Sequence, residues 1–292
     1  MEISYQNIWI KNNQQIKKDE LPPDFIERGI SLYEVLRVIE GVPLFLEQHL
    51  ERLKISARLT NLDLPLNGKE IGQRLQDLIK SNQVENGNIK FVINYPEPGQ
   101  PADFYAYFVE HDYPTKEVYQ KGVKTVLVYV ERPNPNAKVD RADYRNTVDE
   151  AKRRTDSYEA LLVDREGNVS EGGRSNLFMV KGNVVYTAPA DKVLKGITRQ
   201  MVLAACQNQG YRVVEKEISL EETLNMDAIF ISSTSPKVLP VSQVDDKIIN
   251  SGNNKVIQDI MAGYDAIIDN YVKSQGQGDR SLVPLINTEF VN

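Results

Sequence analysis

The spacing of apolar residues changes between strand-like and helical several times in the first hundred positions. Apolar and polar residues alternate from Leu32 to Val38, and the turn Glu40–Gly41 follows, which predicts a strand that opens a hairpin. Apolar residues then recur at helical spacing, which predicts amphipathic helices over residues 46–59 and 68–81. Further strands are expected at residues 8–11, 42–46, 89–95 and 104–109.

A polar stretch from Glu110 to Gly122 separates this part from a strand expected at 123–130, so we place a domain boundary there. The remaining pattern predicts helices at about residues 144–156, from Thr198 onward and at 255–272, and strands at 159–163, 176–180, 184–187, 211–215 and 228–232. No strict strand–helix–strand rhythm is visible, so the predicted class is α+β in two lobes. The expected domains are residues 1–115 and 122–274, followed by an apolar tail at 275–292.

Composition restricts the kind of partner. The formal net charge is -6 over 292 residues, which argues against nucleic acid as a ligand. A single cysteine, Cys206, excludes an intrachain disulfide, and with only two histidines a zinc site is not expected. No apolar run approaches the roughly 20 residues that span a bilayer, and Met1–Tyr5 does not resemble a signal peptide, so we expect a cytoplasmic protein without a membrane partner.

Four segments carry residues suited to chemistry. Each has a common structural explanation when taken alone: a loop lysine is usually solvated, a helical arginine is usually ion-paired, and glycine or threonine often caps a helix. The segments are Gln48–Leu53, Asn136–Lys138, Val169–Phe178 and Leu194–Arg199, with a serine–threonine run at Ser232–Ser235.

Together these segments could bind a phosphate-bearing pyridine aldehyde. The amides of Ile197 and Thr198 would lie at a helix start, where unpaired N–H groups and the helix dipole attract phosphate. The hydroxyls of Ser233 and Thr234 and the guanidinium of Arg52 could complete the phosphate site.

Two further residues would act on the ring of such a group. Lys138 is the candidate for a covalent link to the aldehyde. Glu171 is the candidate carboxylate that keeps the pyridine nitrogen protonated, because a nearby negative charge favours the charged form.

The same segments resemble the signatures of the fold-type IV pyridoxal-phosphate aminotransferases. Val169–Phe178, VSEGGRSNLF, resembles the family's TEGS..N.F. Two more signatures, H..RL..SA and L.GITR..V, are matched at His49–Ala57 and Leu194–Val202. The segments follow the family's order, Lys138 lies 33 residues before Glu171 at very nearly the family's distance, and the likeness extends from about Gly29 to Val272.

The resemblance implies a two-domain fold with a smaller N-terminal α/β lobe and a larger C-terminal lobe with a β-barrel-like sheet. It implies pyridoxal 5'-phosphate (PLP) as cofactor, amino acids and keto acids as substrates, and a homodimer. It also implies the phosphate, nitrogen and covalent roles given above, with Lys138 moving the substrate proton, and it makes Tyr33 a substrate-site residue.

The chain departs from the family pattern at two places. The tyrosine expected within five residues of the lysine is the sixth here, Tyr144, and Lys124 and Lys152 are the alternatives to Lys138. The D-amino-acid branch has a carboxylate-binding arginine after the strand at 89–93, where this chain has Asn94-Tyr95-Pro96. Arg37, on the same strand face as Tyr33, could bind the carboxylate instead, and Tyr95 is a further substrate candidate.

Three activities fit these motifs. The first is an aminotransferase for a small, possibly branched-chain, amino acid. The second is 4-amino-4-deoxychorismate lyase on the same scaffold, which the cofactor motifs do not distinguish. The third is a non-catalytic family member that acts as a binding protein.

Overall fold

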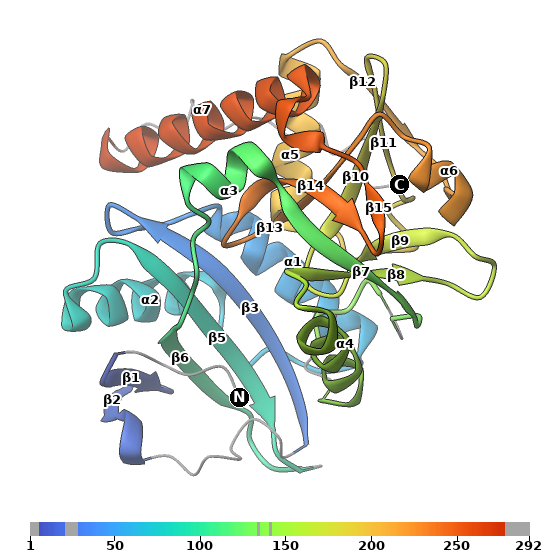
Figure 1. The fold of residues 1–292 in the computed structure, drawn as a ribbon. Coiled ribbons are helices and arrows are strands. Elements are labelled where there is room, and N and C mark those ends of the chain that lie inside the picture. Colours follow the sequence, from blue (N-terminus) through green and yellow to red (C-terminus); the bar gives the residue numbers. More distant parts are fainter. Residues whose placement is uncertain (1–5, 21–28, 98, 133–134, 140–141, 278–292) are drawn as a thin grey trace. The chain divides into compact units, whose positions relative to one another are not determined.

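The computed structural model describes residues 6–20, 29–97, 99–132, 135–139 and 142–277, with only the backbone at 142–144 and 276–277. The chain divides into two compact units, shown in Figure 1. Of the described residues, the first unit contains those up to Asp112, the short segment from Ala137, and the chain from Tyr271 onward. No helix among the described residues is both long and apolar enough to cross a membrane.

The first unit is built on a six-stranded sheet in which all neighbouring strands are antiparallel, in the order β2-β1-β6-β5-β3-β4. Helices α1 and α2 pack against this sheet. Helix α2 begins with a capping box between Asn67 and Glu70. The bounds are β1 Ile8–Lys11, β2 Gln14–Lys17, β3 Ile30–Ile39, β4 Val42–Pro43, α1 Leu46–Leu59, α2 Gly68–Asn82, β5 Gly87–Tyr95 and β6 Asp103–Val109, with a 3-10 turn at Lys18–Glu20.

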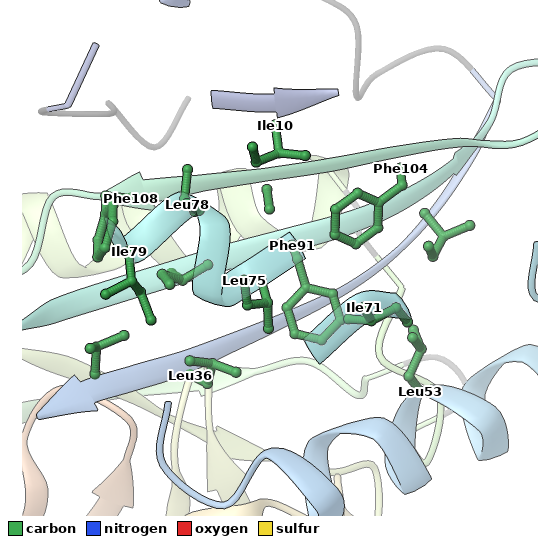
Figure 2. Close-up of a cluster of buried hydrophobic side chains, with 14 of the residues drawn as sticks. Ile10, Leu36, Leu53, Ile71, Leu75, Leu78, Ile79, Phe91, Phe104 and Phe108 are labelled. Atoms are coloured by element: carbon green, nitrogen blue, oxygen red, sulfur yellow. The ribbon is translucent and has the colours of Figure 1, made fainter. Parts of the chain in front are cut away.

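The alternation of β3 and β5 gives the sheet two different faces. One face and the two helices enclose an apolar core that contains Leu36, Phe91 and Phe104 from the sheet and Leu53 and Leu75 from the helices (Figure 2). The opposite face is aromatic and polar. Its buried members include Trp9, Tyr33, Val92, Tyr105 and Tyr107.

The second unit contains a ring of six strands. The order β10-β13-β14-β7-β8-β9 returns to its start because Asn176 on β10 also pairs with Glu171 on β9. Strands β11 and β12 extend the sheet from β10, and β15 pairs with β14. The bounds are β7 Val123–Tyr129, β8 Glu159–Val163, β9 Val169–Gly172, β10 Asn176–Lys181, β11 Val184–Thr187, β12 Arg212–Glu215, β13 Ala228–Ser233, β14 Lys237–Val244 and β15 Lys247–Ile248.

Alternate residues of the ring strands meet in one apolar cluster, with Leu161, Leu177, Ile229, Ile231 and Leu239 among its members. Helix α4 lies against β7 and β8, and α5 lies against β12 and β13. The remaining helices are α3 Lys116–Lys121, α4 Ala142–Thr155, α5 Ile197–Asn208, α6 Leu220–Leu224 and α7 Lys255–Gln277, with a 3-10 turn at Ser251–Asn253; α7 belongs to this unit up to Asn270.

The structure confirms the α+β class and the barrel-like sheet of the C-terminal part. Several features differ from the sequence prediction, and strands β2, β9 and β15 and helix α6 were not expected. The segment Glu110–Gly122 contains the short helix α3, and β4 is only two residues long because the chain turns at Leu44 and Phe45 toward α1. Strand β14 was not expected, since Pro240 interrupts its apolar pattern.

Candidate active site

Lys138 is held in the first unit by its own backbone. Its carbonyl accepts a hydrogen bond from the Tyr33 amide at 3.3 Å, and its amide donates to the Ser56 hydroxyl at 3.1 Å. Val139 forms an antiparallel bridge with Leu32, so this short segment lies along β3. The amine Nζ lies 4.8 Å from the centroid of the Tyr33 ring, a cation–π distance that fixes where the side chain ends.

The same unit contains a cluster of three buried polar side chains, one from β3 and two from α1. Glu34 on β3 is fully buried and accepts hydrogen bonds from Arg52 Nε at 2.8 Å and from Arg52 Nη2. His49 Nδ1 is 2.7 Å from the second oxygen of Glu34. Arg52 is therefore oriented by a two-point contact with a carboxylate, which leaves Nη1 outside that ion pair.

The protonation states in this cluster follow from burial and charge. Burial raises the pKa of Glu34, but the Arg52 guanidinium and the bonds from Arg52 and His49 outweigh it and lower that pKa to about 2. Burial lowers the pKa of His49, and Glu34 opposes this shift only in part. At neutral pH the cluster thus contains one carboxylate, one guanidinium and a neutral imidazole.

The three residues predicted to contact substrate do not share one face of the sheet. Tyr33 and Arg37 are four residues apart on β3 and project to the aromatic face. Tyr95 packs on the opposite face, against the apolar core, and its hydroxyl donates to the Asp63 carbonyl at 2.7 Å. Lys90, which sequence reasoning did not single out, is buried on the aromatic face with its Nζ 4.8 Å from the Tyr33 ring centroid.

Glu171 in the second unit is buried and held on both carboxylate oxygens. Its Oε2 accepts hydrogen bonds from the Leu194 amide at 3.2 Å and from Asn176 Nδ2 at 3.4 Å. Its Oε1 lies 3.4 Å from Arg132 Nη1. The pairing of β8 with β9 is irregular here, because a step of two residues along β8 corresponds to a step of three along β9. This irregularity turns Glu171 away from the apolar cluster that contains Val169.

A row of polar side chains runs from Glu171 across neighbouring strands. Glu171 is opposite Asn176 on β10, and Asn176 is opposite Ser232 on β13, so all three project from one face. The row covers two strand spacings, about 9–10 Å. The buried Oγ of Ser232 has no hydrogen-bond partner among the residues that the structure describes. Ser233 ends β13 next to it, and Thr234 begins the turn to β14.

Helix α5 begins beside the middle of this row. Asn176 Nδ2 donates to the Leu194 carbonyl at 2.9 Å, and a methyl group placed on Gly196, the N-cap, would lie 2.2 Å from Asn176 Oδ1. A glycine cap has no side chain that could accept from the first amides, those of the buried Ile197 and Thr198. In the part of the chain that the structure describes, no N-cap side chain binds these first amides, so the helix start offers N–H groups near the polar row, the usual arrangement for anion binding.

The close approach of Gly196 to Asn176 gives a stability prediction. We expect Gly196→Ala to lower the free energy of unfolding by roughly 1–3 kcal/mol, because the new methyl must displace the asparagine or the helix start. Gly72→Ala in the middle of α2 is the control. Its methyl would make only a 3.4 Å contact with Leu46, and we expect it to stabilise by up to about 1 kcal/mol. Equal effects in urea denaturation would contradict the predicted close packing.

The sequence matches a known family over most of its length. Residues 31–244 match the family model described as amino-transferase class IV. The chain belongs to the class IV aminotransferase family. It is 31% identical over 255 residues to the D-alanine aminotransferase of Bacillus licheniformis, which covers 82% of this chain and 89% of that protein.

Other relatives of this class IV aminotransferase differ in activity. The aminodeoxychorismate lyase of Bacillus subtilis is 24% identical over 261 residues, which is 85% of this chain and 89% of that protein. The solved branched-chain aminotransferase of the archaeon Thermoproteus uzoniensis, with norvaline, has the same fold. Its TM-score is 0.80 at 23% identity, over 95% of this chain and 97% of that chain.

The cofactor of the family is also present among the solved structures of this fold. A branched-chain amino acid aminotransferase solved with pyridoxamine 5'-phosphate has a TM-score of 0.82 at 24% identity, over 94% of this chain and 98% of that chain. Family membership makes this chain a PLP-dependent enzyme.

Sequence reasoning assigned no role to several residues that contact the predicted ones. Ser56 and Asn176 belong to the matched signatures, whereas Glu34, Lys90 and Arg132 were not singled out. Glu34 had a visible signal, since it interrupts the apolar alternation Leu32, Leu36, Val38 on the face that packs against the helices. No sequence pattern indicated a role for Arg132, because it lies in the proline-rich stretch after β7 and outside the matched signatures. The side chain of Tyr144 lies outside the described residues.

Proposed function

We propose that this enzyme moves an amino group between a small amino acid and a 2-keto acid, with PLP as its cofactor. The observation that carries the proposal is the polar row of the second unit. It offers a buried carboxylate at Glu171, an unpartnered hydroxyl at Ser232, and the uncapped start of α5 beside Asn176. A ring nitrogen at the carboxylate and a phosphate at the helix start fit these donors and acceptors.

The phosphate would be bound by backbone and side-chain donors. The amides of Ile197 and Thr198 would donate from the first turn of α5, and Ser233 and Thr234 would add hydroxyls. Arg52 would supply the positive charge, oriented by its ion pair with Glu34. These assignments follow the family resemblance, and the geometry within each unit supports them.

Lys138 would bind the cofactor covalently and act as the base. When bound, PLP supplies a sink for the electron pair that remains at the substrate Cα after deprotonation. The amine of Lys138, set free by the incoming substrate, would take the proton from that carbon. Its backbone bonds to Tyr33 and Ser56 fix the origin of the side chain, and the Tyr33 ring supports its end.

Two residues of the aromatic face would contact the substrate. Tyr33 would lie along its side chain, and Arg37 would bind a carboxylate, since both project from the same face of β3. We do not retain Tyr95 in this role, because it packs against the apolar core on the opposite face of the sheet.

Borohydride labelling tests the cofactor assignment. The PLP-loaded enzyme is expected to be yellow, and reduction should attach the cofactor to the peptide that contains Lys138, as read by mass spectrometry. Lys124→Ala is the control, because Lys124 Nζ donates to the Thr155 carbonyl and has a structural role. A label on Lys124 or Lys152 would refute the assignment, as would a protein that binds no PLP.

Lyase activity is the second candidate, supported by the similarity to the aminodeoxychorismate lyase of Bacillus subtilis. A screen distinguishes the two reactions. We expect turnover of small amino acids, including both enantiomers of alanine and the branched-chain amino acids, with 2-oxoglutarate as acceptor. Pyruvate release from aminodeoxychorismate without amino transfer would support the lyase. We also propose a homodimer, which light scattering of the purified protein tests.

A further inference from the structure

Arg132 approaches the carboxylate to which we assign the cofactor nitrogen, and none of the family motifs includes it. It follows β7 by three residues, and its Nη1 lies 3.4 Å from Glu171 Oε1. The Glu171 side chain is 1% exposed and that of Arg132 is 14% exposed. This ion pair is thus shielded from water, unlike the surface ion pairs of the same unit such as Arg165 with Glu131.

The two oxygens of Glu171 have different partners. Oε2 accepts from two neutral donors, the Leu194 amide and Asn176 Nδ2, and Oε1 faces the Arg132 guanidinium. The 3.4 Å separation is longer than the 2.7–2.9 Å of a strong charged bond, so Arg132 acts on Glu171 mainly through its charge.

We propose that Arg132 is a positioning residue that keeps Glu171 ionised and aimed before the cofactor arrives, so that PLP binds with a protonated ring nitrogen and no proton has to leave the site. A buried carboxylate without a counter-charge takes up a proton instead. Arginine suits this role because it stays protonated at every working pH. The inference rests on the proposed role of Glu171.

The other charged groups on the elements around Glu171 have different partners or positions. Glu159 on β8 accepts from the Ala160 amide, the Arg174 amide and the Ser175 hydroxyl. The Arg174 guanidinium pairs with Asp149 at 2.8 Å. Lys195 precedes the start of α5 in the sequence. Arg132, in contrast, forms an ion pair with Glu171.

The proposal predicts a pH-dependent loss of cofactor affinity in Arg132→Met. If Glu171 is protonated in the cofactor-free variant, PLP binding must release a proton, so the affinity of the variant for PLP decreases as the pH falls. We expect PLP to bind roughly tenfold more weakly than to the parent at about pH 6, and nearly as tightly as to the parent at about pH 8.5. A role in packing alone would give the same loss at both pH values.

The measurement is PLP titration of the cofactor-free full-length enzyme, followed by absorbance across that pH range, with thermal unfolding of each variant. Arg132→Lys should restore the parent's pH profile because it retains a cation, and Arg165→Met, at an exposed ion pair, should not change it. A uniform loss in Arg132→Met, or a failure of Arg132→Lys to restore the profile, overturns the inference.

Glu171→Gln separates this inference from the proposed function. If Glu171→Gln weakens PLP binding at all pH values and Arg132→Met behaves as the parent, the Arg132 inference fails and the cofactor assignment stands. If Glu171→Gln leaves PLP binding and absorbance unchanged, the assignment of Glu171 itself fails, and the inference fails with it.

Discussion

Replacing Lys138 with alanine is expected to lower kcat by about 10⁴-fold or more, because one amine provides both the covalent link and the base. The fold should persist, since the bonds that Lys138 makes to Tyr33 and Ser56 use its backbone and remain in the variant. Steady-state assays with the best amino donor, together with circular dichroism and thermal unfolding, provide the measurement. The variant should also lose its borohydride label.

Two observations separate a missing base from a damaged site. Small primary amines added to Lys138→Ala should restore part of the rate, since they replace the missing base. Lys124→Ala should retain activity near that of the parent, because its amine binds the Thr155 carbonyl. Turnover by Lys138→Ala above about 1% of the parent would contradict the assigned role.

Replacing Glu34 with glutamine is expected to lower the free energy of unfolding by about 3 kcal/mol at neutral pH, because it leaves the buried Arg52 guanidinium without its counter-charge. The pKa of Glu34 is about 2 in the folded protein against an ordinary value of 4.5, a shift that corresponds to roughly 3 kcal/mol. Urea denaturation of parent and variant measures the difference.

The pH dependence of this difference has a defined sign. A carboxyl group whose pKa is lowered by folding stabilises the protein above its unfolded pKa, and the contribution is lost as the pH falls through the folded value. The gap between parent and Glu34→Gln should therefore narrow below about pH 4.5 and nearly close by about pH 2. Glu51→Gln on α1 is the matched control, since Glu51 is 56% exposed and should change stability by less than about 1 kcal/mol. Equal losses in both variants would contradict the buried ion pair.

The local periodicity of the sequence predicts much of the fold. Strands β1, β3, β5 and β6 and helices α1 and α2 were predicted from alternation and helical spacing, because each element buries one face. The closed ring of the second unit does not follow, since it depends on long-range pairing such as that of Asn176 with Glu171. Nothing in the local sequence indicates that the segment from Ala137 belongs to the first unit. It does so through the hydrogen bond between the Tyr33 amide and the Lys138 carbonyl.

The candidate site is only partly predictable for the same reason. Motif residues such as Arg52, Lys138 and Glu171 stand out because they recur in a family with a known order. Their partners Glu34 and Arg132 become apparent only when strands and loops bring them close enough to interact. Tyr95 shows this limit, since only the register of β5 against β3 reveals that it faces the side of the sheet opposite to Tyr33.

The extra residue in β9 has a consequence for how this enzyme tolerates change. Without it, Glu171 would face the same side as Val169 and project into the apolar core, where its charge would be buried without compensation. The number of residues between Val169 and Gly172 therefore decides the direction of Glu171, whatever side chain stands at position 170. Relatives that lose one residue here would need a different source for the carboxylate, whatever their remaining sequence.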